Sequence, residues 1–497
     1  MIADIIARLR GKQIHVVGLS GTEGAAVVEF LLSRGIDTIT AHELQSEETF
    51  PETFRRVHEW MTPAEQDAAI RRLLAAPIRR QFRGHYLEGL GRADVIYAGQ
   101  AWFRHPENAP VRRARDAGVP LSSMTELFFE TVPCPILGVT GTNGKFTVVH
   151  LASQMLSASG IRTFVSGNDR THVPILYRLH EVTADSVLVL EISNRQLLGL
   201  RYSPHIAVVT NLAPHHLDDH GSFEAYVEAK RGILDHQRAG DWAILNADDP
   251  ATWGLAPASR ARVLPFSRTQ DVAEGACLRG GEITVRLDGR EERICPSAAL
   301  KVPGSHALEN ALAAALGARV AGATPEAIAE VLRAFGGLPY RMRLAAEIDG
   351  VRYYEDSLAT NPAAAAAAIR AFDRPLVLIA GGQRRGGTAE DFAPIAAALR
   401  ERPVRAVLLI GAMAGHIEAA IGRSNGGPAV IRCESLESAV RTAREVARPG
   451  DVVSLSPGCE SFDQFRDYRE RGNRYLALVT ALSPDREDAT RGQRRWS

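Results

Sequence analysis

The feature that most constrains the fold is an alternation of short apolar strands with longer helical stretches. Four apolar runs in the middle of the chain lie at residues 136–139, 186–190, 206–211 and 242–246, and amphipathic segments separate them. Parallel strands with helices on both faces of their sheet have such continuous apolar runs, because both sides of each strand are buried. The sequence therefore predicts an α/β protein built on parallel sheets.

The chain length and the positions of proline and glycine residues predict three domains. The chain has 497 residues, and a domain typically has about 150. Pro133 and Pro135 precede the apolar run at 136–139, and Gly336-Gly337 marks a second boundary. We expect domains at residues 1–132, 133–338 and 339–482, followed by a charged tail at 483–497.

Composition excludes several classes of protein. Hydrophobic residues make up 45% of the chain, charged residues 23%, and the formal net charge is zero. No apolar run approaches the roughly 18 to 20 residues that cross a bilayer, and the start lacks a signal region. Five scattered cysteines show no metal-ligand spacing. We expect a cytoplasmic, disulfide-free protein without nucleic acid or membrane as its partner.

Two local patterns frame the rest of the chain. A glycine turn at 18–24 lies between an expected strand at 13–17 and an expected helix at 25–33; it fits a structural turn or a nucleotide-phosphate site equally well. Residues 45–92 are charged and helical in pattern. Further segments are expected as an antiparallel excursion within 265–300, a long helix from 303 to 322, and strands at 352–355, 376–380, 406–410, 430–433 and 452–455.

The strongest motif is a glycine-rich loop that follows a strand and precedes a helix. Residues 138–147 read Gly-Val-Thr-Gly-Thr-Asn-Gly-Lys-Phe-Thr. Backbone amides of such a loop bind phosphate oxygens, and Lys145 can reach the terminal phosphates. The loop departs from the strict P-loop at Val139 and at Phe146, where a magnesium-binding hydroxyl normally follows the lysine. The alternative is a glycine turn with an incidental lysine.

Lysine usage singles out a second residue. Only four of the 58 basic residues are lysine, so a retained lysine is a candidate for a site that needs a compact amine that can lose its proton. Lys145 is one, and Lys230 lies fourteen residues after His216. With Glu191 at the end of an apolar strand, these residues predict a magnesium–nucleotide site. Each of these residues taken alone is also compatible with a structural role.

Taken together, these segments resemble the Mur ligases of peptidoglycan synthesis over residues 13–480. The closing segment 455–472 narrows the resemblance to the branch that joins D-glutamate to UDP-N-acetylmuramoyl-L-alanine. The segments that carry it are Gly-Thr-Asn-Gly-Lys at 141–145, 191–196, His216 with Lys230, 304–306 with Asn310, Asp-Ser-Leu-Ala-Thr-Asn at 356–361, and 455–472.

The resemblance implies a fold and a reaction. We expect a Rossmann-like N-terminal domain for UDP, a central P-loop ATPase domain with a parallel sheet, and a Rossmann-like C-terminal domain for the amino acid. ATP and Mg²⁺ would convert the substrate carboxylate to an acyl phosphate, which the glutamate amine attacks. The expected partners are UDP-N-acetylmuramoyl-L-alanine and glutamate, and the expected state is a monomer.

The resemblance also implies roles for individual residues. Lys145, His216 and a carbamoylated Lys230 would be catalytic. ATP would contact Gly141, Thr142, Asn143, Gly144, Lys145, Phe146, Thr147, Asn310, Arg341 and Asp356. The metal would be held by Thr147, Glu191, His216 and Lys230. The substrates would contact Thr22, Asn168, Thr360, Arg385, Ser461 and Tyr468.

Several departures from the family pattern leave alternatives open. Leu358 and Arg385 both stand where the family has lysine, and Tyr468 replaces a phenylalanine. His42 replaces an aspartate after the second strand. The alternatives are a sister ligase for L-glutamate or another acidic amino acid, and a catalytically weakened nucleotide-binding paralogue, which Phe146 favours.

Overall fold

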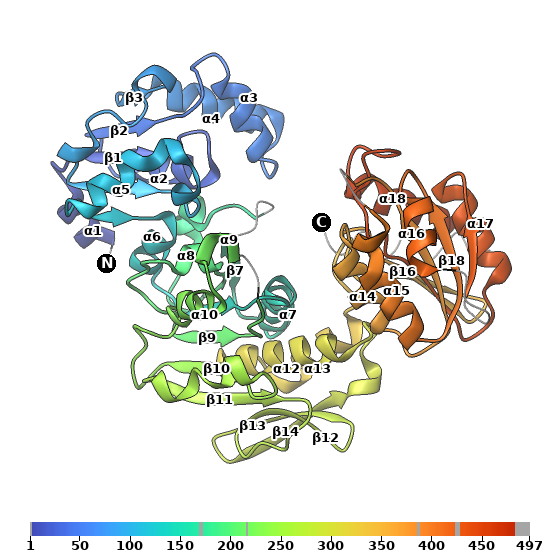
Figure 1. Ribbon diagram of the computed structural model, residues 1–497. Coiled ribbons are helices and arrows are strands. Elements are labelled where there is room, and N and C mark those ends of the chain that lie inside the picture. Colours follow the sequence, from blue (N-terminus) through green and yellow to red (C-terminus); the bar gives the residue numbers. More distant parts are fainter. Residues whose placement is uncertain (1, 168–171, 215–216, 385–387, 423–427, 483–497) are drawn as a thin grey trace. The chain divides into compact units, whose positions relative to one another are not determined.

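The computed structural model describes residues 2–167, 172–214, 217–384, 388–422 and 428–482. The chain forms two compact units (Figure 1). Unit 1 contains Met1–Ser297 and Glu309–Leu332, and unit 2 contains Ala298–Leu308 and Arg333–Ser497. Unit 1 carries two sheets and unit 2 carries one. The expected α/β class is confirmed.

The first sheet of unit 1 has five parallel strands in the order β3-β2-β1-β4-β5. The expected first strand and helix are both present, although the helix begins at Thr22 rather than at residue 25. Residues 45–92 contain the helices α3 and α4, in line with their helical pattern, and also the edge strand β3, which the charged pattern concealed. The strands are β1 (Ile14–Val17), β2 (Ile39–His42), β3 (Arg79–Gln81), β4 (Val95–Ala98) and β5 (Leu121–Ser122). The helices are α1 (Ile2–Leu9), α2 (Thr22–Ser33), α3 (Phe50–Val57), α4 (Pro63–Ala75), α5 (Ala109–Asp116) and α6 (Met124–Thr131).

The second sheet of unit 1 has nine strands in the order β14-β13-β12-β11-β10-β9-β6-β8-β7. The strands from β7 to β12 in this order are parallel, and β12, β13 and β14 form the expected antiparallel excursion. The strands are β6 (Ile136–Thr140), β7 (Thr163–Gly167), β8 (Val187–Glu191), β9 (Ile206–Val209), β10 (Trp242–Asn246), β11 (Arg262–Ser267), β12 (Gly275–Arg279), β13 (Glu282–Leu287) and β14 (Arg290–Pro296).

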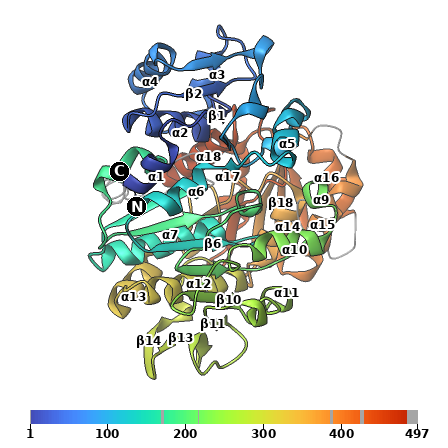
Figure 2. The same ribbon diagram turned by 90° about the vertical axis from the view of Figure 1, so that its left-hand side faces the viewer.

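The position of β6 in this sheet sets the place of a ligand. The chain runs from β6 to β7 and β8 on one side and then to β9 on the other, so the strand order reverses at β6. Open α/β sheets bind ligands at the carboxyl ends of the strands where the order reverses. Helices α7 and α12 pack against this sheet (Figure 2). The helices that follow it are α7 (Lys145–Ala158), α8 (Asn194–Leu197), α9 (Leu217–His220), α10 (Phe223–Arg231), α11 (Pro250–Trp253), α12 (Ser305–Val320) and α13 (Pro325–Ala334).

Unit 2 contains a six-stranded sheet in the order β15-β16-β20-β17-β18-β19, in which only β15 is antiparallel. The five strands expected here are all present. The strands are β15 (Arg343–Ile348), β16 (Val351–Glu355), β17 (Leu376–Gly381), β18 (Val404–Ile410), β19 (Ala429–Arg432) and β20 (Val452–Leu455). The helices are α14 (Pro362–Arg370), α15 (Ala393–Glu401), α16 (Ala414–Ile421), α17 (Leu436–Val446) and α18 (Tyr468–Leu482).

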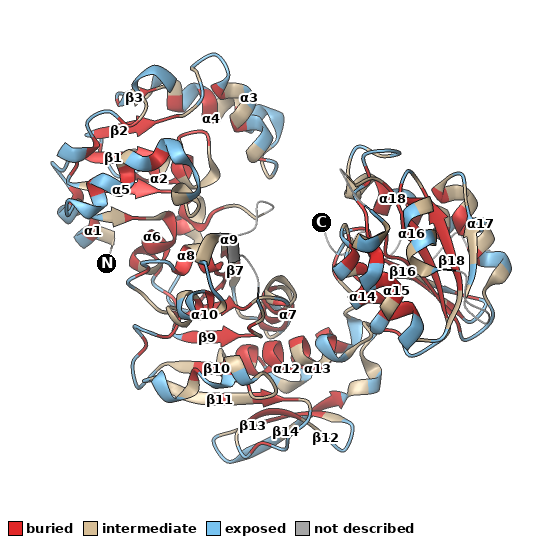
Figure 3. Ribbon diagram, viewed as in Figure 1, coloured by how far each residue is buried: buried red, intermediate tan, exposed pale blue. Residues whose placement is uncertain are grey.

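The two sheets of unit 1 share buried apolar residues. One continuous apolar cluster joins the five-stranded sheet to the nine-stranded sheet, from Val16 and Phe128 to Leu188 and Leu245. The two faces of the sheet in unit 2 have cores of their own. Figure 3 shows the buried strands at the centre of each unit. In the described part of the chain, no helix is long and apolar enough to cross a membrane.

Candidate functional site

The glycine-rich loop lies at the carboxyl end of β6 and opens α7. Gly144 is the residue before α7 and has a φ of 83°, and Gly141 has a φ of 143°. A Cβ atom at Gly144 would lie 2.1 Å from Oδ1 of Asn310, and one at Gly141 would lie 1.9 Å from Oγ1 of Thr210. Only glycine fits at either position. The structure thus brings the predicted residue Asn310, from α12, to the loop.

Residues after β9 hold this loop in shape. The Thr142 amide donates to the Asn211 carbonyl at 2.8 Å, and the Asn143 amide donates to Oδ1 of Asn211 at 3.0 Å. The hydroxyl of Thr210 donates to the Asn143 carbonyl at 2.6 Å. Thr210 and Asn211 were not among the predicted site residues, although their place at the end of an apolar run was a usable signal.

The predicted phosphate-binding lysine lies on the loop itself. Nζ of Lys145 donates to the carbonyls of Gly141 and Thr142 at 3.0 and 3.1 Å. The next side chain, Phe146, has its ring centroid 6.5 Å from that of His150, one turn along α7. The first turn of α7 therefore presents an aromatic ring after the lysine, and Thr147 supplies the nearest hydroxyl in the chain.

Lys230 is the most deeply buried amine of the site. The residue is 1% exposed, and its Nζ donates to Oγ1 of Thr140 at 3.2 Å. Burial, and next the charge of Lys145, lowers the pKa of Lys230 well below its ordinary value, while Glu191 opposes the shift. A lysine in this environment loses its proton readily. Thr140, the last residue of β6, is a further residue that the sequence analysis missed.

Glu191 lies beside the loop at the end of β8. Glu191 pairs with Val139 of β6, and the residue before it pairs with Gly138. A Cβ atom at Gly167, the last residue of β7, would lie 2.2 Å from the Glu191 carbonyl oxygen. Asn168, which follows Gly167, and His216 lie outside the described residues. Among the residues that are described, no group of three or more His, Cys, Asp or Glu side chains could hold a metal.

The donor set at this edge fits a phosphate group and, with one modification, Mg²⁺. The glycine-rich loop at the start of α7 has the backbone type whose amides bind phosphate oxygens, and Lys145 supplies a cation there. Mg²⁺ requires oxygen ligands, and the Glu191 carboxylate is one. A carbamate on Lys230 would add a second anionic oxygen, whereas a protonated amine would repel the ion.

Two carboxylates, the half-buried Glu23 and the buried Glu43, accept hydrogen bonds at the N-terminal glycine turn. The Ser20 amide donates to Oε2 of Glu43 at 2.6 Å, and Oε2 of Glu23 accepts from the Gln100 amide at 2.8 Å. Burial raises the pKa of Glu23 to about 7. Thr22, predicted to contact the diphosphate, donates its hydroxyl to the Val57 carbonyl at 3.3 Å. His42 is buried, with its Nε2 2.8 Å from Nδ1 of His15.

In unit 2, the predicted residues lie on loops at the carboxyl ends of β16 and β20. Asp356 is buried; its Oδ1 accepts from the Met342 amide, and its Oδ2 accepts from the Ser456 hydroxyl, both at 3.1 Å. Burial raises the pKa of Asp356 to about 7. Arg341 precedes Met342 and is exposed, and its charge partly opposes this shift.

A buried arginine joins the two loops that carry the predicted glutamate-binding residues. Nη2 of Arg471 donates to the carbonyls of Ser357 and Cys459 at 2.9 and 3.1 Å, so it fixes the loop of Thr360 against that of Ser461. Ser461 is buried and Thr360 half-buried. Tyr468 opens α18, and its ring meets that of Tyr340 edge-on at 5.6 Å. Arg385 lies outside the described residues.

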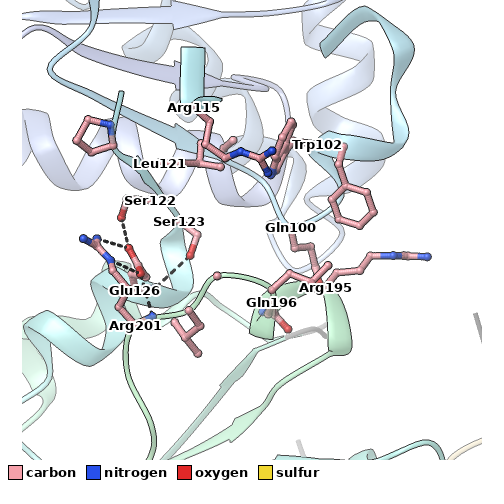
Figure 4. Close-up of a pocket in the computed structure, with 16 residues that line it drawn as sticks. Gln100, Trp102, Arg115, Leu121, Ser122, Ser123, Glu126, Arg195, Gln196 and Arg201 are labelled. Carbon is pink, nitrogen blue, oxygen red and sulfur yellow. Dashed lines mark hydrogen bonds and ion pairs between the residues drawn. The ribbon is translucent and has the colours of Figure 1, made fainter. Parts of the chain in front are cut away.

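A cavity of about 540 Å³ lies in unit 1 between the five-stranded sheet and the segment around α8 (Figure 4). Trp102, Arg115 and Leu121 line its upper side in the figure, and Glu126 with Arg201 lies opposite them. Its lining includes Gln196, at the end of the 191–196 motif, but none of the predicted site residues that the structure describes.

Two protein-family models and several relatives match this chain. Residues 139–318 match the Mur ligase middle domain, and residues 340–459 match the Mur ligase glutamate ligase domain. A UDP-N-acetylmuramoylalanine–D-glutamate ligase of Symbiobacterium thermophilum is 37% identical over 94% of this chain and 98% of its own length. A protein of the same name from Pelotomaculum thermopropionicum is 35% identical over 95% and 98% of the two chains.

Solved structures support the same fold. A pseudomurein peptide ligase type C from Methanothermus fervidus aligns with a TM-score of 0.53 at 19% identity, over 95% of this chain and all of its own. A UDP-N-acetylmuramate–alanine ligase from Thermotoga maritima aligns with a TM-score of 0.53 at 17% identity, over 95% and 100% of the two chains. At these identities the likeness concerns the fold alone.

Proposed function

The chain belongs to the Mur ligase family, and we propose that it joins the amino group of D-glutamate to the alanine carboxyl of UDP-N-acetylmuramoyl-L-alanine, at the expense of ATP. The observation that carries this proposal is the meeting of a glycine cradle, Lys145, Glu191 and Lys230 at the point where the order of the nine-stranded sheet reverses. The near full-length relatives that share this named activity support it.

The residues of unit 1 would bind and activate the phosphate donor. When bound, ATP with Mg²⁺ supplies the phosphoryl group that turns the alanine carboxylate into an acyl phosphate and leaves ADP. Loop amides at 141–144 and the Lys145 amine would hold the terminal phosphates, where cations stabilise the charge of a transferring phosphoryl group. Glu191, His216, Thr147 and a carbamate on Lys230 are the proposed metal ligands.

The residues of unit 2 would bind the amine donor and part of the nucleotide. Thr360, Ser461 and Arg385 are the proposed glutamate contacts, with Tyr468 nearby in sequence. Arg385 suits a carboxylate because a guanidinium binds one with two parallel hydrogen bonds. The glutamate amine then attacks the acyl carbon, an amide bond forms, and phosphate leaves. Arg341 and Asp356, together with Asn310 of unit 1, are the proposed nucleotide contacts.

One observation favours a second candidate, a ligase for L-glutamate or another acidic amino acid. Leu358, which is 40% exposed, stands on the proposed glutamate loop where the family pattern has a lysine. An apolar side chain there cannot pair with a substrate carboxylate, so selection of the amino acid would depend on other residues.

Phosphate release distinguishes these candidates. We expect release from ATP only when UDP-N-acetylmuramoyl-L-alanine and D-glutamate are both present, and none after Mg²⁺ is removed with EDTA. Faster release with L-glutamate would favour the second candidate. Release that needs no amino acid at all, or no release under any of these conditions, would contradict the ligase assignment.

A further inference from the structure

Residues 99–104 form a short segment that contacts two parts of unit 1, the N-terminal glycine turn and the helices next to the proposed metal site. It follows β4 and includes the single turn η3 (Trp102–Arg104). On one side, the Gln100 amide donates to Glu23 in the first turn of α2, beside the N-terminal glycine turn. On the other side, it reaches α8 and α9, which follow β8 and β9 of the nine-stranded sheet.

Two interactions make the second connection. Oε1 of Gln100 accepts from the hydroxyl of Ser193 at 2.5 Å, and Ser193 caps α8 two residues after Glu191. The second is an ion-pair cluster around Asp219 in α9. Its Oδ1 lies 3.0 Å from Nε of Arg104, and its Oδ2 accepts from Nη2 of Arg195 at 2.6 Å.

The Asp219 carboxylate is well placed to transmit a displacement. Its side chain is 3% exposed, and each of its two oxygens is bound by a guanidinium from a different segment. Charge-assisted hydrogen bonds are about twice as strong as neutral ones and are directional. Arg195 lies four residues after Glu191, and Asp219 three residues after His216. A shift of Arg104 therefore acts on the two chain segments that carry proposed metal ligands.

We propose that Asp219 is a positioning residue that couples binding at the N-terminal glycine turn to nucleotide binding at the carboxyl edge of the nine-stranded sheet. When the 99–104 segment moves, Arg104 moves with it. The ion pairs of Asp219 then transmit this displacement through Arg195 to α8. Occupancy of the N-terminal site by the sugar nucleotide then fixes the segment that follows Glu191. This inference rests on the proposed function, because it names the two ligands that function requires.

Calorimetric titration of ADP with Mg²⁺, with and without saturating UDP-N-acetylmuramoyl-L-alanine, tests the coupling. In the wild-type chain we expect the sugar nucleotide to tighten ADP binding by about fivefold or more, the lower end of typical coupling between sites. Arg104 is 43% exposed, so Arg104→Gln is expected to fold normally. It should reduce the enhancement to less than about twofold and leave the affinity for ADP alone unchanged.

Asp219→Asn and a matched control complete the design. Asp219→Asn keeps the shape but loses the charge, so we expect the same loss of enhancement, together with weaker binding of ADP. Asp235→Asn is the control, because the side chain of Asp235 is 40% exposed and forms an ion pair with Arg231, four residues before it, at 3.6 Å. It should retain the full enhancement.

The possible outcomes separate this inference from the proposed function. Wild-type phosphate release combined with an undiminished enhancement in Arg104→Gln and Asp219→Asn would overturn the inference alone. The same holds if Asp235→Asn loses as much enhancement, or if the wild-type chain binds both ligands independently. A wild-type chain that neither binds the sugar nucleotide nor releases phosphate would overturn the proposed function, and this inference with it.

Discussion

Lys230 illustrates how the environment of a single residue constrains its chemistry. It is one of only four lysines, and it is buried beside Thr140. Its pKa is lowered, chiefly because burial disfavours the charged ammonium. The neutral amine that results can react with carbon dioxide to form a carbamate. An arginine could not do so, because its guanidinium group stays protonated in proteins.

We predict that Lys230→Ala lowers the rate of phosphate release by about 100-fold or more, the scale seen when one charge-stabilising group is removed. Added acetate should restore part of the rate, because it returns the missing anionic oxygen, and Lys230→Arg should gain nothing from acetate. Release assayed over a range of acetate concentrations checks this. Lys12→Ala, at an exposed amine 3.6 Å from Asp94, is the control. Near wild-type release by Lys230→Arg would argue for a plain cationic role.

The sequence predicted those site residues that motifs mark and missed those that only the fold brings together. Lys145 lies on the glycine loop that follows one apolar run, and Glu191 ends another, so their place at the edge of a sheet follows from these runs. Arg195 and Asp219 are 24 residues apart, on two short helices after different strands. Their contact depends on β6 lying between β8 and β9, and no pattern in the sequence specifies that order.

The end of strand β16 places two carboxyl groups next to each other in the core of unit 2. Burial raises the pKa of Glu355 and of Asp356, each to about 7. Between about pH 4 and pH 7 the folded chain therefore keeps protons that the unfolded chain has released. Stability from these groups is fully present below about pH 4, falls as the pH rises to about 7, and is level above that.

We predict that Asp356→Asn reduces the fall in melting temperature of unit 2 between pH 5 and pH 7.5, because the amide has no proton to lose. One kcal/mol corresponds to about 2–4 °C for a domain of this size, so a change of several degrees is measurable. Asp373→Asn, at an exposed carboxylate paired with Arg402, should leave the pH dependence as in the wild-type chain. An unaltered pH dependence in Asp356→Asn would mean that this carboxyl group does not retain its proton.

Among the secondary-structure elements, the central strands of the sheets were easier to predict from the sequence than the edge strands. The runs at 376–380 and 406–410 are apolar throughout, because β17 and β18 are buried on both faces. Strand β3 escaped prediction because Arg79–Gln81 is polar and pairs only with β2 at the edge of its sheet. Edge strands of this kind carry charge, which hides them in a hydropathy pattern.

In the molecule as a whole, the number of sheets differs from the number of compact units. The described residues form three sheets, yet the five-stranded and nine-stranded sheets share one apolar cluster within unit 1. Segments that share a core unfold together, because exposing one face of the core removes the support of the other. Residues 298–308 belong to unit 2, although residues 309–332, which follow them, belong to unit 1. No pattern in the sequence marks this change of unit.

We predict two thermal transitions in scanning calorimetry, not three, with unit 1 melting as one body. Arg471→Met removes hydrogen bonds to buried carbonyls of Ser357 and Cys459, and each unsatisfied buried group costs about 1–3 kcal/mol. It should lower the melting temperature of unit 2 by several degrees and leave that of unit 1 unchanged. ADP with Mg²⁺ should raise chiefly the transition that Arg471→Met does not move, because the glycine-rich loop and Lys145 belong to unit 1. A third transition, or a shift of both transitions by Arg471→Met, would contradict this division of the chain into two cooperative units.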